Sequence, residues 1–378
     1  MNNKKVFQLI TVSKSVYLLK GQIEYLRKNK INMHLISSEG KELEQYPDNI
    51  VHKIQIKREI SIIKDIQSLL KLIILFLKER PYIVNAGTPK AGLLGMLASY
   101  ITRRPHRIYT VRGLRLETVS GNKYKILFLM EKIAMFCATD IIAISDSLKN
   151  RIIELNLNSN KKIKVFGNGS SNGLNLKDYK KSDNNIENAI YRQLDGQFVI
   201  GYLGRIVKDK GIEDLVNAFK IIEKKYSNVK LLVIGSIEDG DPINQHDLSF
   251  ILNNKNVIYK NHVDKPIKYY NNMDVFIFPT YREGFGNVSI EAQALGIPTI
   301  TYNVTGAKDT VINNETGFIV EPGNYEEIAE KIELLINDEN LKVSLGEKGE
   351  QWVNATFSNE IIWKEMLEFY KLKLKEHK

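Results

Sequence analysis

The sequence alternates apolar runs of strand length with segments of helical periodicity from one end to the other, and this alternation restricts the fold more than any other feature. Neighbouring parallel strands must be joined by a crossover, usually a helix, so the pattern predicts parallel sheets covered by helices. Expected helices of the first half include Val16–Lys28 and Tyr124–Cys137. The expected strands there are Lys5–Thr11, Asn32–Ser37, Tyr82–Asn85, Arg107–Val111, Asp140–Ile144 and Lys162–Phe166.

A second series of the same kind begins at Gln197. Apolar positions between Ile212 and Ile222 mark one face of a helix. Asn324, with Glu327 three residues later, predicts a capping box that opens a helix at Tyr325. The strands expected in this series are Phe198–Tyr202, Val229–Ile234, Val257–Lys260, Asp274–Phe278, Thr299–Tyr302 and Gly317–Val320.

The length of 378 residues is sufficient for two domains. The polar stretch from Lys177 to Glu187 lacks apolar periodicity and is the best linker. We therefore predict α/β domains over residues 1–178 and 179–356, and a helix within residues 357–378 that packs back toward the first domain. A ligand is expected in a cleft between two such domains.

The two halves differ in the sign of their charge. Residues 1–180 contain 31 Lys and Arg against 14 Asp and Glu, a net charge of +17, whereas residues 181–378 have a net charge of −7. A compositional bias toward lysine would affect both halves alike, so it does not explain the difference. The basic half indicates an anionic partner, which is a lipid headgroup, a phosphorylated substrate or a nucleic acid.

Two features concern the compartment. Cys137 is the single cysteine, which excludes an internal disulfide and fits a reducing environment. The longest apolar run, Leu69 to Leu77, is about half the length that a membrane span needs, and it carries Lys71. This run predicts an amphipathic helix packed on the core.

The first motif with chemical content runs from Gly201 to Gly211, after a predicted strand and before a predicted helix. Glycines such as Gly204 let the backbone approach a ligand closely. Arg205 and Lys210 can neutralise the two negative charges of a diphosphate.

The second motif, Pro279-Thr-Tyr-Arg-Glu-Gly-Phe-Gly-Asn-Val-Ser-Ile-Glu291, follows a buried strand and leads into a helix. Strand, glycine loop and helix form the arrangement that holds a nucleoside diphosphate. Asn287 is a candidate cap of that helix. Glu291 is placed to accept hydrogen bonds from ribose hydroxyls, whereas Glu283, in the loop, is better placed for a sugar.

A competing signal is the acidic run around Asp239-Gly-Asp241, since two aspartates at this spacing can hold Mg²⁺ or Mn²⁺. The surrounding turn residues favour a solvated loop instead, and no pair of histidines has metal-ligand spacing. His262 follows a predicted strand and is a candidate for a base pocket or for a structural role.

Together the motifs resemble the family 4 retaining glycosyltransferases. The likeness rests on Gly204-Arg-(four residues)-Lys-Gly211 and on Glu283-Gly-Phe-Gly-Asn-(three residues)-Glu291. In the first half, Thr88–Gly95 and Asn168–Gly173 are similar to a subgroup that builds bacterial capsule and O-antigen units. The resemblance covers nearly the whole chain and implies the GT-B fold, two Rossmann-like domains facing across a cleft.

The resemblance also implies roles for individual residues. Arg205 and Lys210 would bind the donor diphosphate and Glu283 the donor sugar, and these three form the predicted catalytic set. Enzymes of this family are usually assigned a front-face mechanism without a metal cofactor, in which the leaving diphosphate takes the proton of the acceptor. The predicted donor-binding residues are Gly204, Gly284, Phe285, Gly286, Asn287 and Glu291, together with His262, which is included for its position after a strand.

The first half departs from the family pattern at two places. Many relatives have a Gly-Gly loop after the first strand, where this chain has Thr11-Val-Ser-Lys-Ser15. Many also have a histidine where this chain has Arg112, and an arginine cannot act as a base near neutral pH. We therefore leave the catalytic base unassigned and expect Ser13, Arg112 and Arg115 to bind a phosphate of donor or acceptor.

The resulting prediction is a retaining, metal-independent glycosyltransferase that moves a sugar from a nucleoside-diphosphate sugar, most simply UDP-linked, to a lipid-linked saccharide. The expected location is the cytoplasm, peripherally on the anionic inner face of the cell membrane. One alternative is a GT-B UDP-sugar 2-epimerase, which needs no acceptor. The other is a basic nucleic-acid-binding protein, against which the acidic second half and the α/β pattern argue.

Overall fold

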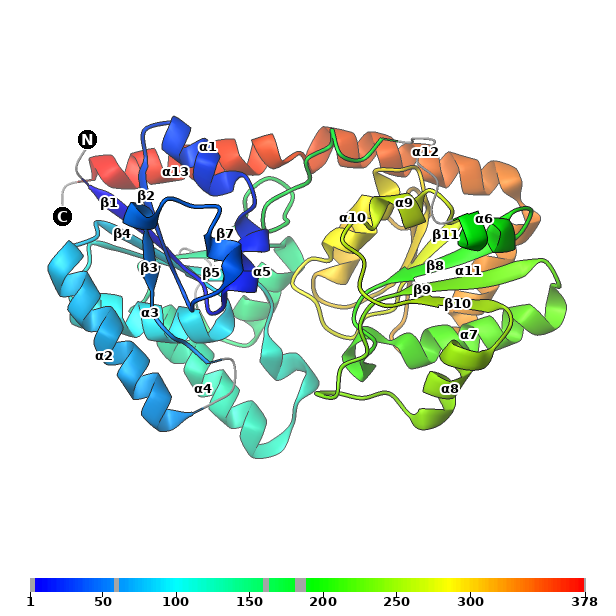
Figure 1. Ribbon diagram of the computed structural model, residues 1–378, viewed down its shortest axis with the longest axis horizontal. Coiled ribbons are helices and arrows are strands. Elements are labelled where there is room, and N and C mark those ends of the chain that lie inside the picture. The colour runs from blue at the N-terminus through cyan, green and yellow to red at the C-terminus, as the bar shows by residue number, and fades with distance from the viewer. Residues whose placement is uncertain (1–3, 58–60, 159–162, 181–187, 377–378) are drawn as a thin grey trace. The chain divides into compact units, whose positions relative to one another are not determined.

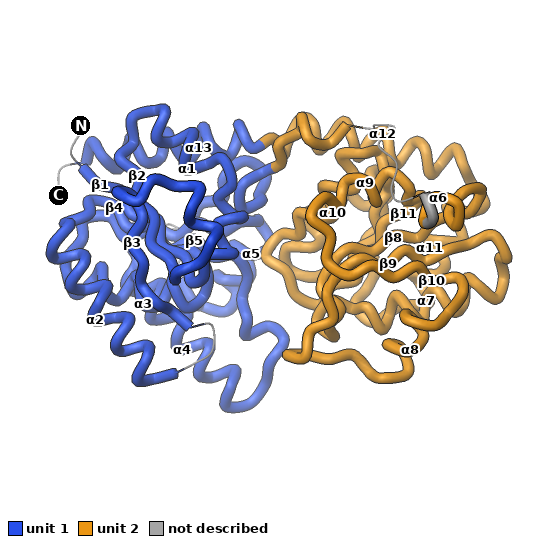
Figure 2. Tube along the Cα trace, viewed as in Figure 1, with its two compact units in different colours: residues 1–173, 359–378 blue, residues 174–358 orange. Residues whose placement is uncertain are grey.

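The structure is a computed structural model that describes the chain except residues 1–3, 58–60, 159–162, 181–187 and 377–378. The chain divides into two units. Unit 1 comprises residues 1–173 and 359–378, and unit 2 comprises residues 174–358 (Figure 2). The C-terminal helix is therefore part of the first unit, although it follows the second in sequence.

Unit 1 is built on a seven-stranded parallel sheet in the order β3-β2-β1-β4-β5-β6-β7. The strand order reverses between β1 and β4, which lie side by side although two strands separate them in sequence. The strands are β1 (Lys5–Leu9), β2 (Asn32–Ser37), β3 (Val51–Lys53), β4 (Ile83–Gly87), β5 (His106–Val111), β6 (Asp140–Ala143) and β7 (Ile163–Lys164).

Helices cover both faces of this sheet (Figure 1). Alternate strand residues point to opposite faces: Val6 belongs to a core formed with α1 and α13, whereas the Phe7 ring lies 6.1 Å from that of Phe76 in α2. The helices are η1 (Ser13–Leu19), α1 (Gln22–Lys28), η2 (Lys41–Leu43), η3 (Asp48–Ile50), α2 (Ile62–Glu79), α3 (Pro89–Ile101), η4 (Arg115–Thr118), α4 (Gly121–Cys137), α5 (Asp146–Glu154) and α13 (Asn359–Lys375).

Unit 2 contains a six-stranded parallel sheet in the order β10-β9-β8-β11-β12-β13. Its strands are β8 (Phe198–Leu203), β9 (Val229–Ile234), β10 (Val257–Lys260), β11 (Val275–Phe278), β12 (Thr299–Tyr302) and β13 (Gly317–Val320). Its helices are α6 (Asn188–Leu194), η6 (Lys208–Lys210), α7 (Ile212–Lys225), α8 (Gln245–Asn253), α9 (Ile267–Tyr270), α10 (Asn287–Gln293), η7 (Ala307–Thr310), α11 (Tyr325–Asn337) and α12 (Glu339–Thr356).

The core of unit 2 has the period of two expected of strands buried on both faces. Ile200 and Tyr202 pack with the buried face of α7, whereas Val199, the residue before Ile200, packs on the other side of the sheet. Asn324 caps α11 as predicted, because its side chain accepts a hydrogen bond from the backbone N–H of Glu327. The reciprocal bond of a capping box is replaced, since the Glu327 carboxylate accepts from the Asn324 side chain and the Asn324 N–H donates to the carbonyl of Glu321. The predicted alternation of strands and helices is confirmed in both units.

Four sequence expectations need correction or restriction. The single helix expected over Val16–Lys28 is wrong, because Gly21, with φ +78°, separates η1 from α1. The short edge strand β3 was not predicted, since its three residues have no pattern of their own. Lys162, expected to begin a strand, and residues 181–187 of the expected linker lie outside the described residues.

The run Leu69–Leu77 lies within α2, where the expected amphipathic pattern is only half present. Ser68, Leu72 and Phe76 face the core, but the opposite side of the helix also carries exposed apolar side chains. Among the residues that the structure describes, no helix combines the length and apolarity needed to cross a bilayer.

Candidate active site

The two predicted donor motifs lie at the point where the strand order of unit 2 reverses. One motif follows β8 and the other follows β11, and these two strands are hydrogen-bonded neighbours although β9 and β10 separate them in sequence. In open parallel sheets, the crevice at the carboxyl ends of such strands is where ligands bind. The fold therefore brings the loops after residues 203 and 278 to one edge.

Lys210 and Glu283 form the centre of this edge. Lys210 Nζ lies 2.5 Å from Oε2 of Glu283, 3.3 Å from the carbonyl oxygen of Arg282 and 3.4 Å from Thr280 Oγ1. Burial alone would raise the pKa of Glu283, but the Lys210 ammonium outweighs it and holds that pKa below the usual value. Glu283 is thus a fixed carboxylate, and Lys210 a fixed cation.

Two further ion pairs flank this centre. Arg205 donates from Nη1 to Glu238 Oε2 at 2.9 Å, and Arg282 donates from Nη2 to Asp209 Oδ2 at 2.6 Å. Burial opposes the charge of Arg205, but the Glu238 hydrogen bond and the Asp209 carboxylate raise its pKa overall. Arg205 is the more exposed cation, with 47% of its side chain accessible, so an incoming anion can reach it.

Asp241, the second residue of the alternative metal motif, has a different role in the structure. Its carboxylate accepts a hydrogen bond of 2.8 Å from the backbone N–H of Asp209, and its carbonyl accepts one from Lys208. The acidic run thus fixes the loop that carries Lys210. Among the described residues, no group of three acidic, His or Cys side chains has metal-binding geometry.

Glycines allow the two loops to approach each other. Gly211 has φ +66°, and a Cβ there would lie 1.8 Å from the carbonyl oxygen of Pro279. Gly286 has φ +100°, and its Cβ would lie 2.4 Å from the ring of Phe278. Gly286, not Asn287, occupies the cap position of α10, so the expectation that Asn287 caps this helix is wrong.

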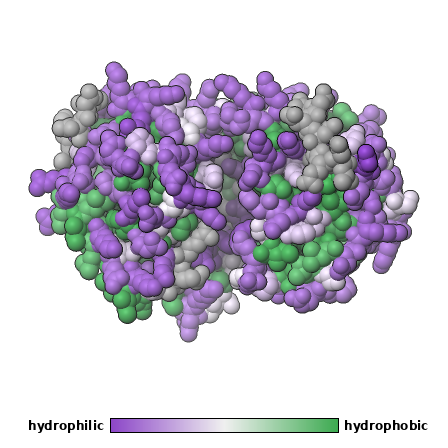
Figure 3. Space-filling view, in the orientation of Figure 1, coloured by the Kyte–Doolittle hydropathy of each residue, from purple (hydrophilic) through white to green (hydrophobic). Residues whose placement is uncertain are grey.

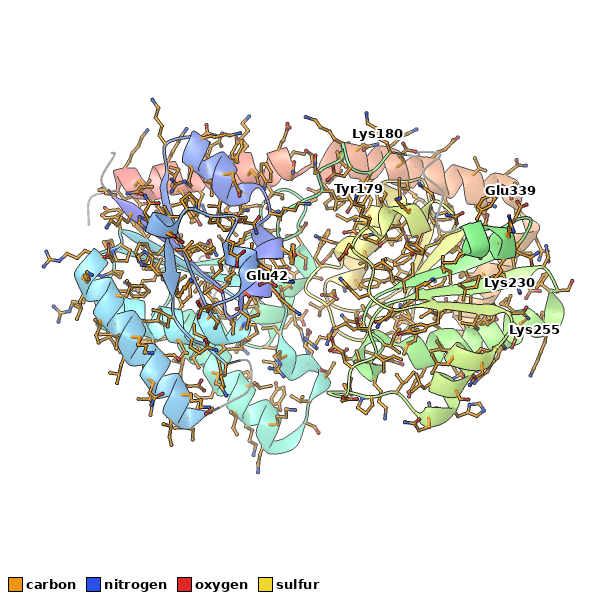
Figure 4. The ribbon with its side chains drawn as sticks, in the orientation of Figure 1. Glu42, Tyr179, Lys180, Lys230, Lys255 and Glu339 are labelled. Atoms are coloured by element: carbon orange, nitrogen blue, oxygen red, sulfur yellow. The ribbon has the colours of Figure 1, made fainter. Side chains whose placement is uncertain are left out.

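Glu291 is held by two tyrosines that are distant in sequence. Tyr270 in α9 donates to Glu291 Oε2 at 3.2 Å, and Tyr179 donates a second hydrogen bond. Figure 4 places Tyr179 beside α9 and α10. Burial raises the pKa of Glu291 and the two hydroxyl groups partly offset that rise. The carboxylate is therefore oriented before any ligand arrives.

The other predicted donor residues lie at the same edge with different degrees of access. The Phe285 ring is 1% exposed and lies 5.3 Å from the ring of Phe357, so only its backbone is available to a ligand. Gly204 and Gly284 belong to the loops after β8 and β11. His262 lies two residues beyond β10, with 76% of its side chain exposed.

In unit 1 the strand order also reverses at one place, between β1 and β4. Thr11 follows β1 and Thr88 follows β4, and their hydroxyl oxygens lie 2.6 Å apart. Thr88 has φ +79°, which is unusual for a residue with a side chain. Polar side chains therefore meet at the carboxyl edge of this sheet too.

Arg112 follows β5 at the same edge, next to β4. Its Nε and Nη1 are buried, and neither has a hydrogen-bond partner among the described residues. A Cβ at Gly87 would lie 2.9 Å from Nε, so glycine leaves room for the guanidinium. Burial lowers the pKa of Arg112 to about 10, with Tyr370 partly offsetting this. Arg112 thus remains a cation at neutral pH.

The other two predicted phosphate ligands differ from Arg112. Ser13 is 7% exposed and donates its hydroxyl hydrogen to Glu42 Oε2 at 2.6 Å, so this hydrogen is committed to a carboxylate (Figure 4 labels Glu42). Phosphate binding by Ser13 stays a prediction, and it would require the hydroxyl group to exchange its hydrogen bond with Glu42. Arg115 begins η4 and is exposed.

The sequence analysis missed several residues that complete the unit 2 site. Asp209 and Arg282 lie inside the two quoted motifs, and their opposite charges were the available signal. Tyr179 and Tyr270 are 112 and 21 residues from Glu291 in sequence, and no local pattern connects them to it.

Comparison with known proteins identifies the class. Residues 5–147 match the family described as glycosyl transferase 4-like, and residues 183–352 match the family described as glycosyl transferases group 1. Among solved structures, Anabaena HepE in complex with UDP has a TM-score of 0.78 and 20% identity, with 97% of this chain and 99% of that chain covered. The protein is therefore a glycosyltransferase with the GT-B fold.

Curated relatives define the family further. The chain is 59% identical over 376 residues to the capsular polysaccharide biosynthesis glycosyltransferase CapM of Staphylococcus aureus, covering 100% of this chain and 99% of that protein. It is 27% identical to the UDP-Gal:alpha-D-GlcNAc-diphosphoundecaprenol alpha-1,3-galactosyltransferase of Escherichia coli, over 85% of this chain and 84% of that one. The chain belongs to the family 4 glycosyltransferases, as the motifs predicted.

Proposed function

We propose that this glycosyltransferase moves a sugar from a UDP-sugar to a lipid-linked saccharide, with retention of anomeric configuration, in the synthesis of a capsule-type surface polysaccharide. The observation that carries the proposal is the Lys210–Glu283 pair at the edge where the β8 and β11 loops meet. The names of the S. aureus and E. coli relatives support the polymer class and the type of acceptor. UDP in the structure of HepE supports the donor.

The donor diphosphate would bind Arg205 and Lys210. The Arg205–Glu238 pair is exposed on both sides, and such a pair contributes little stability, so a diphosphate oxygen can replace the Glu238 carboxylate at small cost. The three N–H groups of Lys210 already face three oxygen atoms, so a phosphate oxygen would replace one of the two longer contacts, to Arg282 or Thr280, while the Glu283 contact holds the ammonium in place. Both cations would stabilise the charge that develops on the leaving UDP.

Glu283 would accept hydrogen bonds from hydroxyl groups of the transferred sugar, since its carboxylate is kept ionised by Lys210. In the proposed step the acceptor hydroxyl oxygen bonds to the anomeric carbon on the face that the diphosphate leaves. The bond between that carbon and the β-phosphate oxygen breaks, and the proton of the acceptor passes to the departing UDP. Such a step needs no basic side chain, which fits the presence of Arg112 where the family resemblance implies a histidine in many relatives.

The nucleoside would be held by Glu291. Its oriented carboxylate can accept hydrogen bonds from both ribose hydroxyls, with Tyr179 and Tyr270 fixing its position. His262 remains a predicted contact of the base. We further propose that the reaction is metal-independent, because the carboxylate of Asp241 is used to fix the Asp209 loop.

On the acceptor side, Arg112 would bind a phosphate of the lipid carrier. Two of its nitrogens are buried without a partner, and an unpaired buried donor costs free energy that an anion would recover. The lipid of such an acceptor would place the reaction on the cytoplasmic face of the cell membrane.

The proposal is tested with the purified full-length protein. Thermal-shift measurements against a panel of sugar nucleotides identify the donor, and transfer to a short-chain lipid-diphosphate saccharide is then followed by NMR of the new anomeric proton. Retained configuration together with UDP release supports the proposal. Conversion of the donor without any acceptor would indicate the 2-epimerase, and tight binding of nucleic acid without UDP binding would indicate the nucleic-acid alternative.

A further inference from the structure

Helix α2 carries apolar side chains on the side that faces away from the core. The exposed residues are spaced three or four positions apart, so they form one stripe along the helix. Their exposed fractions run from 52% to 73%, and the helix of 18 residues is about 27 Å long. The stripe consists of Ile63, Ile66, Leu70, Ile74 and Leu77. Figure 3 shows apolar residues at the surface over this helix.

A row of lysines runs beside this stripe. Lys64, Lys71 and Lys78 are seven residues apart, two helical turns, and all are exposed. None forms an ion pair with a carboxylate among the described residues. The acidic residues of α2 are instead paired on the inner side, Asp65 with Lys90 and Glu79 with Lys5. A neighbouring ammonium, that of Lys57, lowers the pKa of Lys64, which indicates crowded positive charge.

Helix α4 repeats the arrangement, and α3 lies between α2 and α4. Ile126, Leu129 and Phe136 of α4 are each more than half exposed, and Lys125 and Lys132, again seven residues apart, lie beside them. The outer side of α3 is also apolar, and its Tyr100 ring lies 6.0 Å from that of Phe136 in α4. We call the outer sides of α2, α3 and α4 the α2–α4 face.

A cavity of about 620 Å³ opens where α3 ends, and arginines line it. Arg104 and Arg107 donate only to backbone carbonyl groups, and no Asp or Glu lines the cavity. The Arg107 guanidinium also lies 5.6 Å from the Tyr100 ring. Burial lowers the pKa of both arginines, and for Arg107 the nearby Asp140 carboxylate opposes part of that effect. The residues that line the cavity therefore include cations and no anion.

These observations point to one kind of partner. A contiguous apolar face rimmed by cations matches a bilayer of anionic lipids, whose acyl region takes the apolar stripe and whose phosphates pair with Lys and Arg. A second copy of the chain fits less well, because a symmetric contact would bring two sets of lysines together. We propose that the α2–α4 face is the docking surface for an anionic membrane and that the arginine cavity receives a lipid phosphate.

The inference rests on the proposed function, since a lipid-linked acceptor requires the enzyme to work at a membrane. It goes further by naming the face that docks and the cavity that receives a lipid phosphate. The test is co-sedimentation of the full-length protein with phosphatidylglycerol-containing vesicles and, in parallel, with phosphatidylcholine vesicles. We expect binding to the anionic vesicles, release by salt, and much weaker binding to the zwitterionic ones.

Two variants address the two parts of the face. The first combines Leu70→Gln with Ile74→Gln, and the second combines Lys64→Glu, Lys71→Glu and Lys78→Glu. These side chains are exposed, so the fold should persist. Each variant should lower vesicle affinity about tenfold or more. The controls change exposed residues of α1 and α13 instead. Leu372→Gln is the control for the apolar variant. The triple charge reversal Lys28→Glu, Lys371→Glu, Lys375→Glu is the control for the lysine variant.

The outcomes separate the alternatives. Vesicle binding unchanged in both variants would overturn the docking surface. A second outcome would also overturn it: the wild-type protein is a dimer, and the Leu70→Gln, Ile74→Gln variant is a monomer with unchanged vesicle binding. A second copy of the chain would then cover the face. UDP affinity is measured on the same preparations. If the wild-type protein binds vesicles but does not bind UDP, the proposed function is contradicted and the docking surface is not.

Discussion

Nζ of Lys210 lies 2.5 Å from Oε2 of Glu283, so the residue expected to hold the diphosphate and the residue expected to hold the sugar are joined by an ion pair. The pair links the β8 and β11 loops across the point where the strand order reverses. In the absence of donor, each charge is neutralised by the other. A bound diphosphate would therefore share Lys210 with Glu283.

Replacement of Lys210 by alanine tests this arrangement. We expect kcat to fall about 100-fold or more, because the leaving diphosphate loses a fixed cation. UDP release in the transfer assay measures the effect. The control is Lys208→Ala, an exposed lysine two residues away, which should leave kcat unchanged. Wild-type turnover in the Lys210→Ala protein would contradict the diphosphate assignment.

Replacement of Glu238 by glutamine should strengthen the binding of UDP. The Glu238 carboxylate competes with the diphosphate for Arg205, and the exposed pair is worth less than about 1 kcal/mol. We therefore expect UDP affinity to rise about two- to threefold in titration calorimetry. Arg205→Ala should instead weaken UDP binding. Equal weakening in both variants would indicate that Glu238 itself contacts the nucleotide.

Replacement of Glu291 separates the ribose contact from the phosphate contact. We expect Glu291→Gln and Tyr270→Phe to weaken UDP binding, the first by about tenfold, because hydrogen bonds to a charged acceptor are lost or misaligned. Comparison of UDP with 2′-deoxy-UDP provides the check, since the Glu291→Gln effect should shrink for the deoxy ligand while the Lys210→Ala effect should not. An equal Glu291→Gln effect on both ligands would rule out a contact with the 2′-hydroxyl group.

Replacement of Gly211 by alanine should destabilise unit 2. The residue combines φ +66° with a Cβ position 1.8 Å from the Pro279 carbonyl oxygen, so the β8 and β11 loops must separate. We expect a loss of about 2–3 kcal/mol in the free energy of unfolding and weaker UDP binding. Gly240→Ala is the control, because a Cβ there meets no atom within 4 Å. An unchanged melting temperature in Gly211→Ala would show that the loops relax freely.

The stability of unit 1 should depend on pH through His34. Burial, followed by the neighbouring His52 ring at 3.1 Å, lowers the pKa of His34 to about 4. Above pH 6.5 neither folded nor unfolded His34 is protonated, so it contributes no pH dependence there. Below pH 6.5 the unfolded chain takes up a proton that the folded chain refuses, and stability falls by up to about 3 kcal/mol as pH drops toward 4.

Fluorescence can follow this effect in one unit. Trp363 lies in unit 1, where its Nε1 donates to Asn172, and Trp352 lies in unit 2. In a Trp352→Phe background, urea unfolding of unit 1 is read from Trp363 between pH 4 and pH 7. His34→Gln should flatten the dependence. A dependence as steep in His34→Gln as in the background protein would assign the effect to other groups.

The sequence predicted some elements to the residue and failed on others for identifiable reasons. Strands β2, β9, β10, β12 and β13 have the predicted bounds, because turn residues flank a clean apolar run. The break between η1 and α1 was missed because the helical pattern of apolar residues continues across it. The break occurs at Gly21, which has φ +78° and whose missing side chain leaves room for the Trp363 ring, 2.6 Å from where a Cβ would lie. That space depends on a helix more than 300 residues away in the chain.

By itself, the sequence determined the order of strands and helices, the two motifs that carry Arg205, Lys210, Glu283 and Glu291, and the membership of the chain in a glycosyltransferase family. These depend on periodicity and spacing within short segments, which local sequence contains. Only the tertiary structure decided that Tyr179 and Tyr270 hold Glu291, that Asp241 accepts a hydrogen bond from the Asp209 backbone, and which of two apolar sides of α2 faces the core. These outcomes depend on contacts between segments that are distant in the chain. The residue pattern of one segment does not indicate which other segments will pack against it.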